Sequence, residues 1–427
     1  MNYTALFKIS IKKLDVIILF IMSISSVIVG MAGNKTFLLW ELCLLFFVIL
    51  YKAKFSFFSA FSFILLFSYL QEHIAALNQN LAGGMLYAGL GVPVYITELY
   101  ICTSFFFVME YIFFSFSKIL GNEKKMYTTK IVLSKRIAYL FAVSAFGLII
   151  LSYPTLPTLS GTLARNEGVI QSSRFVQVAM LLLAITFDSA KKEKMLYVIW
   201  VISLVWILFH GDRVIVFGFL IYCAFKYLNT QSGLSNKVKN KIVEHKKIIF
   251  VGIAGLLVAA LGIRLQLSRS GYSTANLNLS TVFRNILVQG TACDVVYVFN
   301  CATDMWKHGN LLNGYTFLQY IVCWIPFLPN PYYPAAVIMK YYTTLGGGLF
   351  FAEPMMNVGL IGTCVFSFLF LMFLNIVLNK PSNYKCFFWI PFILTIFRMT
   401  WYLGLDSWVT MSIYITPILY YIAKRFR

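Results

Sequence analysis

Apolar runs close to 20 residues long recur along the whole chain, and they constrain its fold more than any other feature. About 20 apolar residues in a helix span the hydrocarbon of a bilayer. Only 12% of the 427 residues are charged, against about 25% in a typical soluble domain. The runs therefore predict an all-α polytopic membrane protein. An outer-membrane barrel would instead show short segments of alternating polarity.

About twelve transmembrane helices are expected, in a single integral membrane domain formed by residues 1–427, since no repeat or linker divides the chain. The first run follows three lysines but is longer than a signal-peptide core, which favours an uncleaved helix. The expected spans are residues 14–33, 36–51, 55–72, 92–117, 137–153, 175–190, 195–210, 214–228, 248–263, 356–378, 386–404 and 408–423.

Lysines and arginines are divided unequally among the connections between these spans. With the N-terminus in the cytoplasm, 25 of the 35 fall in cytoplasmic segments, as the positive-inside rule requires. Both termini are therefore predicted to be cytoplasmic. The net charge of +20 then reflects topology and contact with anionic lipid, and no nucleic-acid partner is expected.

The ten remaining basic residues differ in kind from the cytoplasmic ones. They comprise seven arginines and three lysines, whereas the cytoplasmic set holds 22 lysines and three arginines. A guanidinium group binds phosphate oxygens through two parallel hydrogen bonds, which a lysine cannot do. The outer arginines therefore predict phosphate binding, although pairing with an acid or a lipid headgroup is an alternative for each. They are Arg165, Arg174, Arg213, Arg264, Arg269, Arg284 and Arg398.

Two outer connections carry further polar residues. His210 and Arg213 lie in a four-residue turn between the seventh and eighth spans. Residues 264–354 form one long extracytoplasmic loop. This loop holds a helix-like apolar stretch, residues 281–306, and the proline-broken segment "YTFLQYIVCWIPFLPNPYYP", which is predicted to lie in the interface or re-enter the membrane. It ends in "LGGGLFFAEPMMNVGLIG", where Glu353 precedes the tenth span.

Three short patches resemble the bacterial O-antigen polymerase family (Wzy, oligosaccharide repeat-unit polymerases). They are "EPMMNVGLIG" from Glu353, the Gly-Asp-Arg turn, and "GYTFLQYIVCWIPFLP". The resemblance in topology covers nearly the whole chain. It implies a polytopic glycosyltransferase of the C superclass in the bacterial inner membrane. Such an enzyme transfers glycan from an undecaprenyl-diphosphate donor to another undecaprenyl-diphosphate-linked repeat unit at the periplasmic face.

The candidate residues suit that chemistry. Glu353 is the expected base for the acceptor hydroxyl, and His210 and His308 are alternatives because imidazole is the commonest general base. Capping of a helix N-terminus is the structural alternative for Glu353. Preorganised cations would stabilise the developing negative charge of the leaving diphosphate, and Arg213 is the arginine expected to be catalytic in this way, beside Glu353 and His210. The expected diphosphate-binding residues are Arg213, Arg264, Arg284, Arg174, Arg165 and Arg398.

Two other functions remain open. One is an O-antigen ligase of the same fold, which would move glycan to lipid A core, with His308 as its candidate loop histidine. The other is a flippase or transporter for lipid-linked oligosaccharides, although such proteins tend to show internal repeats. No metal or cofactor is expected, since neither metal-ligand spacing nor a nucleotide fingerprint is present. The expected partners are the undecaprenyl-diphosphate-linked oligosaccharide, as donor and acceptor, and the lipid membrane; a polysaccharide chain-length regulator is a further candidate.

Overall fold

The described part of the chain is helical. The computed structural model describes residues 13–88, 90–156, 173–190, 193–210, 214–229, 287–322, 325, 333–402 and 408–426. Within them no strand occurs, and the one β-type contact is an isolated bridge between Gly348 and Tyr402. Six of the described helices are long and apolar enough to cross a membrane. The sequence prediction of a helical membrane protein is confirmed at this level.

The chain divides into two compact units, and unit 1 comprises residues 1–124, 288–381 and 398–406. It contains five of the six candidate membrane helices. Its described elements are α1 (Lys13–Ala32), α2 (Lys35–Ala53), α3 (Phe57–Leu77), η2 (Gln79–Leu81), α4 (Gly84–Ala88), α5 (Ile96–Phe116), α14 (Gly290–Lys307), η4 (Tyr315–Phe317), α15 (Leu318–Val322), α16 (Pro334–Ile338) and α17 (Ala352–Leu378).

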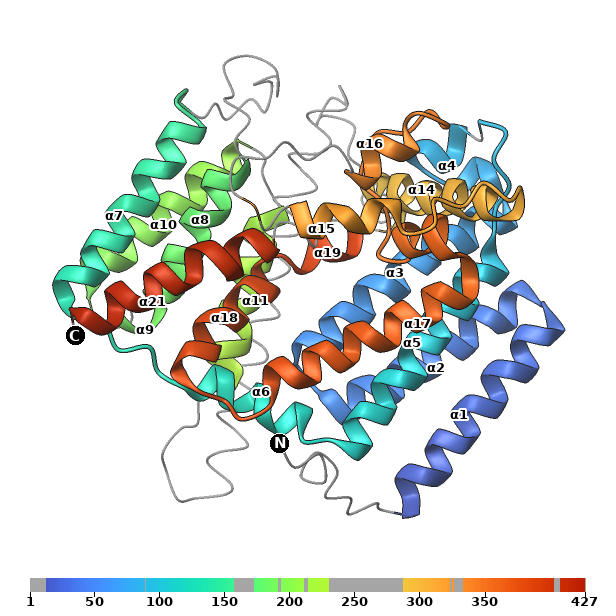
Figure 1. Cartoon of the computed structure of the whole chain (residues 1–427), viewed down its shortest axis with the longest axis horizontal. Coiled ribbons are helices and arrows are strands. Elements are labelled where there is room, and N and C mark those ends of the chain that lie inside the picture. Colours follow the sequence, from blue (N-terminus) through green and yellow to red (C-terminus); the bar gives the residue numbers. More distant parts are fainter. Residues whose placement is uncertain are drawn as a thin grey trace, which may run out of the picture. The chain divides into compact units, whose positions relative to one another are not determined.

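Helix α14 runs across one end of the long helices α3, α5 and α17 in unit 1 (Figure 1). Two connections far apart in sequence meet at this end. The Met85 N–H donates to the Asp294 carboxylate at 2.8 Å, and the Tyr95 N–H donates to the Asn300 side chain at 3.2 Å. Residues from the predicted outer loop 264–354 are thus packed against the connection between α3 and α5.

Unit 2 comprises residues 125–287, 382–397 and 407–427. Helix α7 packs on α8 and α10, while α18 packs on α8, α11 and α21. Two of the boundaries with unit 1 fall within helices, namely α6 (Ile119–Thr128) and α19 (Ile396–Trp401). The described elements of unit 2 are α7 (Lys135–Ser152), α8 (Ser173–Ile185), α9 (Phe187–Ala190), α10 (Lys194–Phe209), α11 (Val214–Asn229), α18 (Asn383–Leu394), the π-helical turn η5 (Thr410–Ile415) and α21 (Thr416–Arg425).

Local side-chain hydrogen bonds fix several helix ends. Asn34 caps α2 by accepting from two backbone N–H groups, and Ser56 forms a capping box with Ser59 at the start of α3; such side chains satisfy donors that a helix start leaves unpaired. The sixth and eleventh predicted spans are interrupted at Thr186 and Thr395, whose hydroxyls donate to carbonyls of the preceding turn. The ninth predicted span, residues 248–263, lies outside the described residues.

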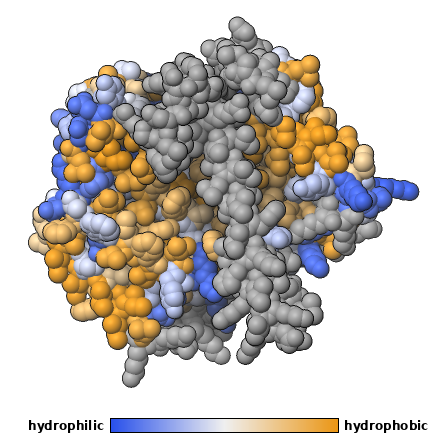
Figure 2. Space-filling model, turned by 180° about the vertical axis from the view of Figure 1, so that it is seen from behind, coloured by the Kyte–Doolittle hydropathy of each residue, from blue (hydrophilic) through white to orange (hydrophobic). Residues whose placement is uncertain are grey.

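The candidate membrane helices expose large apolar side chains. Met31 of α1 is 84% exposed and Ile361 of α17 is 81% exposed. Hydrophobic residues cover much of the visible surface of the described helices (Figure 2). Exposing such side chains to water is unfavourable, by roughly 25 cal/mol for each Å² of apolar surface. These surfaces therefore suit a lipid environment.

Candidate functional site

Glu353 lies in the first turn of α17, and hydrogen bonds hold the chain just before it. The Gly348 N–H donates to the Trp401 carbonyl at 3.0 Å, and the Phe350 N–H donates to the Thr400 carbonyl at 2.8 Å. The backbone just before α17 is therefore held by hydrogen bonds to the residues that follow Arg398. Glu353 itself is 2% exposed. A carboxylate at such a position needs hydrogen-bond donors to offset its loss of water.

Two hydroxyl groups donate to the Glu353 carboxylate. The Thr316 Oγ1 donates to Oε1 at 2.8 Å, and the Tyr320 hydroxyl donates to Oε2. Both residues come from η4 and α15, in the predicted loop. Hydrogen bonds to a charged acceptor are shorter and stronger than neutral ones. Side chains from another segment thus orient the Glu353 carboxylate. Its contacts therefore extend beyond the N-terminus of α17.

Asn357, one helical turn after Glu353, completes this network. Its Nδ2 donates to Thr316 Oγ1 at 2.6 Å and to the Glu353 carbonyl at 2.8 Å, while its Oδ1 accepts from the Thr316 N–H at 3.3 Å. The Thr316 hydroxyl therefore accepts from an amide and donates to the carboxylate. This chain fixes the direction of the hydroxyl proton toward Glu353.

The network joins two of the patches on which the family resemblance rests. Glu353 and Asn357 belong to "EPMMNVGLIG", and Thr316 and Tyr320 belong to "GYTFLQYIVCWIPFLP". The sequence prediction gave Glu353 a role but assigned none to the other three. Hydroxyl residues inside an apolar segment broken by prolines were the available signal, since such groups require partners wherever they are buried.

Gly359 marks a kink in α17 shortly after the network. Its φ is +69° and its ψ is −168°, which departs from helical geometry. A Cβ at this position would lie 2.6 Å from Trp306 Nε1 of α14. Glycine is required here on both counts, because other residues avoid positive φ and because the indole occupies the space of a side chain.

A second polar cluster in unit 1 surrounds Asp304 near the end of α14. The hydroxyls of Tyr95 and Tyr342 donate to its two carboxylate oxygens at 2.7 and 2.8 Å. Burial raises the pKa of both phenols, and the hydrogen bonds to Asp304 raise it further, so both remain donors at neutral pH. His308 is exposed, with Nδ1 3.5 Å from the Asp304 carboxylate.

His210, predicted as an alternative base, lies at the C-terminal end of α10 in unit 2. Its Nδ1 lies 2.7 Å from the Trp206 carbonyl and its Nε2 lies 2.9 Å from the Thr155 carbonyl. The ring also stacks on Tyr153, with centroids 4.9 Å apart. These contacts tie the histidine to the backbone on both sides and give it a clear structural role in its turn.

Arg398 is the predicted phosphate ligand that the structure describes most fully. It is half-buried, and its guanidinium lies 5.7 Å from the centre of the Tyr402 ring. Its Nε is buried and has no hydrogen-bond partner among the described residues. A buried donor without a partner is costly. The Arg398 Nε–H is therefore available to donate a hydrogen bond to an anionic or polar ligand.

The other predicted arginines have side chains outside the described part of the structure. Arg174 lies in α8, and its side chain is outside the described part. Outside the described residues altogether are Arg165, Arg213, Arg264 and Arg284.

In the described ranges, no group of three or more His, Cys, Asp or Glu side chains lies close enough to hold a metal ion. Searches against protein-family models, curated proteins and solved structures find no match to this chain.

Proposed function

We propose that this protein is an oligosaccharide repeat-unit polymerase of the O-antigen type. It transfers glycan from an undecaprenyl-diphosphate donor to an undecaprenyl-diphosphate-linked repeat unit, at the periplasmic face of the bacterial inner membrane, with both termini in the cytoplasm. The observation that carries this proposal is the hydrogen-bond network of Glu353, because it unites two separate patches of the family resemblance. The candidate membrane helices support the required lipid setting.

Glu353 serves as the general base in this proposal. The acceptor hydroxyl gives its proton to the carboxylate as its oxygen bonds to the donor sugar. The bond between that sugar and the lipid diphosphate breaks, and the diphosphate leaves with the electron pair. A base must lie within about 2.6–3.2 Å of the oxygen that carries the proton, or reach it through one water. The half-buried Tyr320 hydroxyl already donates to the carboxylate and is the group that an acceptor hydroxyl would displace.

Arginine side chains stabilise the leaving diphosphate in the same proposal. Among these arginines, Arg398 has the most structural support. The residues after it hydrogen-bond to the segment just before Glu353, and its Nε has no partner among the described residues. The remaining members of the proposed set are Arg165, Arg174, Arg213, Arg264 and Arg284. Preorganised cations of this kind lower the barrier because they need not reorient as charge develops.

Glu353→Gln tests the proposal with purified protein and lipid-diphosphate repeat units, in the absence of nucleotide. Loss of a general base lowers the rate roughly 10²- to 10⁴-fold, and we expect polymer formation to fall by that amount. Glu110→Gln is the matched control. Glu110 is a fully buried carboxylate of unit 1 that also accepts from a hydroxyl, the Ser62 Oγ at 2.5 Å. Normal polymer from stable Glu353→Gln protein would remove Glu353 as the base.

The O-antigen ligase remains a second candidate because His308 is exposed beside Asp304. Supplying lipid A core as the sole acceptor separates the two enzymes, since a ligase uses it and a polymerase does not. In cells, deletion of a polymerase leaves lipopolysaccharide capped with one repeat unit. Deletion of a ligase leaves bare core with polymer on the lipid carrier, and deletion of a flippase traps single repeat units inside.

A further inference from the structure

A cavity of about 230 Å³ lies in unit 2, among α18, α21 and the segment that joins α6 to α7. The proposed glycan transfer makes no use of it. The polar part of its wall includes Lys130, Lys424, Thr129 and Asn383. Two lysines and two smaller polar side chains therefore line one partly open cavity.

Neither cavity lysine is neutralised by a described carboxylate. Lys130 and Lys424 are both exposed and form no ion pair within the described ranges. The two carboxylates that the structure describes in unit 2, Asp188 and Glu193, pair with other lysines at 2.6 and 3.1 Å. The described part of the cavity lining is thus positively charged and favours an anionic ligand.

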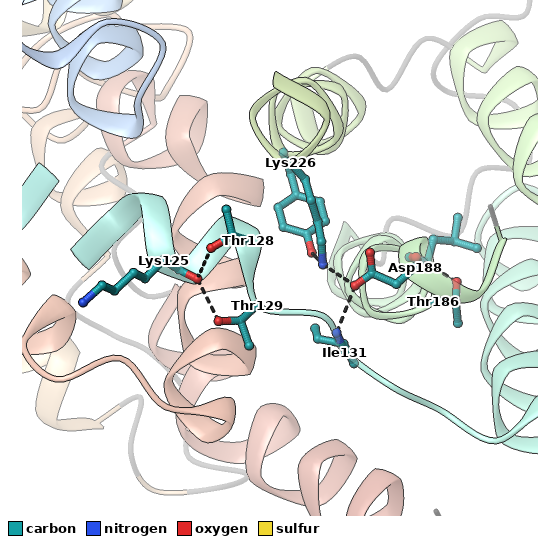
Figure 3. Close-up of polar contacts among 9 residues, drawn as sticks. Lys125, Thr128, Thr129, Ile131, Thr186, Asp188 and Lys226 are labelled. Atoms are coloured by element: carbon teal, nitrogen blue, oxygen red, sulfur yellow. Dashed lines mark hydrogen bonds and ion pairs between the residues drawn. The ribbon is translucent and has the colours of Figure 1, made fainter. Parts of the chain in front are cut away.

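A buried ion pair fixes the wall that carries Lys130. The Ile131 N–H donates to Asp188 Oδ2 at 2.9 Å, and the Lys226 ammonium donates to the same oxygen at 2.6 Å (Figure 3). Lys226 is 3% exposed. The residue next to Lys130 is therefore anchored to the interior of unit 2, and the lysine stem starts from a defined position.

The rest of the cavity wall is apolar and aromatic. The rings of Phe387 and Tyr420 meet edge to face, with centroids 5.4 Å apart. Large apolar side chains beside the cavity face outward, among them Val132 at 59% exposure and Tyr421 at 60%. A free phosphate ion would use only the lysines, whereas a phospholipid would use both parts of this wall.

We propose that this cavity binds the phosphate headgroup of an anionic phospholipid such as phosphatidylglycerol. Lys130 and Lys424 bind the phosphate oxygens, Asn383 and Thr129 hydrogen-bond to the headgroup, and the aromatic wall contacts the glycerol and upper acyl carbons. The segment that joins α6 to α7 and the C-terminal end of α21 are both predicted to be cytoplasmic. Basic pockets on that side of a membrane protein are suited to anionic headgroups.

Native mass spectrometry of delipidated protein with added phosphatidylglycerol or phosphatidylcholine tests this site. We expect wild-type protein to prefer phosphatidylglycerol. Lys130→Gln with Lys424→Gln should weaken phosphatidylglycerol binding roughly tenfold to thirtyfold, from about 1 kcal/mol for each lysine, and weaken the binding of phosphatidylcholine, whose phosphate is offset by its choline cation, much less. Ala423→Leu, which fills the cavity while keeping both lysines, should lower the same preference.

Lys125→Gln with Lys194→Gln is the matched control, because it removes two exposed lysines that lie outside the cavity lining. Figure 3 shows the Lys125 side chain pointing away from Asp188. An equal loss of preference in this control would overturn the proposal in favour of diffuse surface charge. Retained preference in the cavity variants would overturn it as well. Displacement of phosphatidylglycerol by excess inorganic phosphate would assign the site to free phosphate instead of lipid.

Discussion

Glu353 in unit 1 and Asp188 in unit 2 are both carboxylates in the first turn of a helix, but different donors hold them. Asp188 accepts from the buried ammonium of Lys226 and from a backbone N–H. Glu353 accepts from the hydroxyls of Thr316 and Tyr320. An ammonium that neutralises its partner in the interior serves structure. Hydroxyls are the group that a sugar acceptor also presents, so in the proposed reaction the acceptor would replace one of them at little cost.

Breaking the ion pair of Asp188 should have the largest effect on stability. Lys226→Met leaves the partly buried Asp188 carboxylate without its cationic partner, although the Ile131 N–H still donates to it. We expect a cost of about 3 kcal/mol, the lower end of the range for a broken buried pair, and a clear fall in the thermal unfolding temperature in detergent. Lys194→Met, at an exposed position, should change it little. Addition of Asp188→Leu to Lys226→Met should restore much of the loss. A double variant as unstable as the single one would show that the pair contributes through packing.

Removing one of the two hydroxyl groups that donate to Glu353 should have a smaller effect on stability and a clear effect on activity. Tyr320→Phe keeps the ring, and water can reach the half-buried site, so we expect a cost of about 1 kcal/mol. Polymer formation should fall roughly tenfold, less than the loss of a base. Tyr341→Phe, at an exposed tyrosine of unit 1, is the control. Inactivity equal to that of Glu353→Gln, with normal stability, would make Tyr320 itself a catalytic group.

A third carboxylate, Asp294, extends the comparison, because its protonation should make stability depend on pH. We expect this effect on stability to be the smallest of the three. Burial raises the pKa of Asp294 above its usual 3.8, although the Met85 N–H lowers it in part. The folded state therefore binds this proton more tightly than the unfolded chain, and stability is lost as the pH rises through the raised pKa. Asp294→Asn keeps an oxygen to accept from Met85.

Thermal unfolding of wild-type and Asp294→Asn protein from acid to neutral pH measures this difference. The variant should be the more stable protein at neutral pH, and the advantage should disappear at acid pH, where Asp294 is protonated. A variant that is less stable than wild type at neutral pH would mean that the charge of Asp294 is needed where it lies.

The helical class and the position of Glu353 at a helix start could be predicted from the sequence, because both depend on local features. Apolar runs of spanning length define α1 to α3, and the glycines and Pro354 mark the start of α17. Interruptions at Thr186 and Thr395 were not predicted. Their hydroxyls compete for backbone carbonyls inside apolar runs, and such competition leaves no trace in hydropathy.

The contacts of the candidate site could not be predicted, because they join residues far apart in the chain. Tyr320 and Thr316 lie 33 and 37 positions from Glu353. Likewise, Lys226 was counted among the cytoplasmic charges that set topology, whereas it is buried against Asp188, 38 positions away. The sequence shows which side chains are present, whereas the tertiary packing determines which of them form hydrogen bonds or ion pairs with one another.

The length of α17 has a consequence for the depth at which the proposed transfer would take place. Its 27 residues rise about 40 Å, at about 1.5 Å per residue, whereas the hydrocarbon of a bilayer is about 30 Å thick. The excess of about 10 Å is roughly seven residues, which matches the segment 352–358 that precedes the kink at Gly359. The turn that carries Glu353 would then project from the hydrocarbon into the zone of polar headgroups, the depth at which the diphosphate of a prenyl-linked sugar resides.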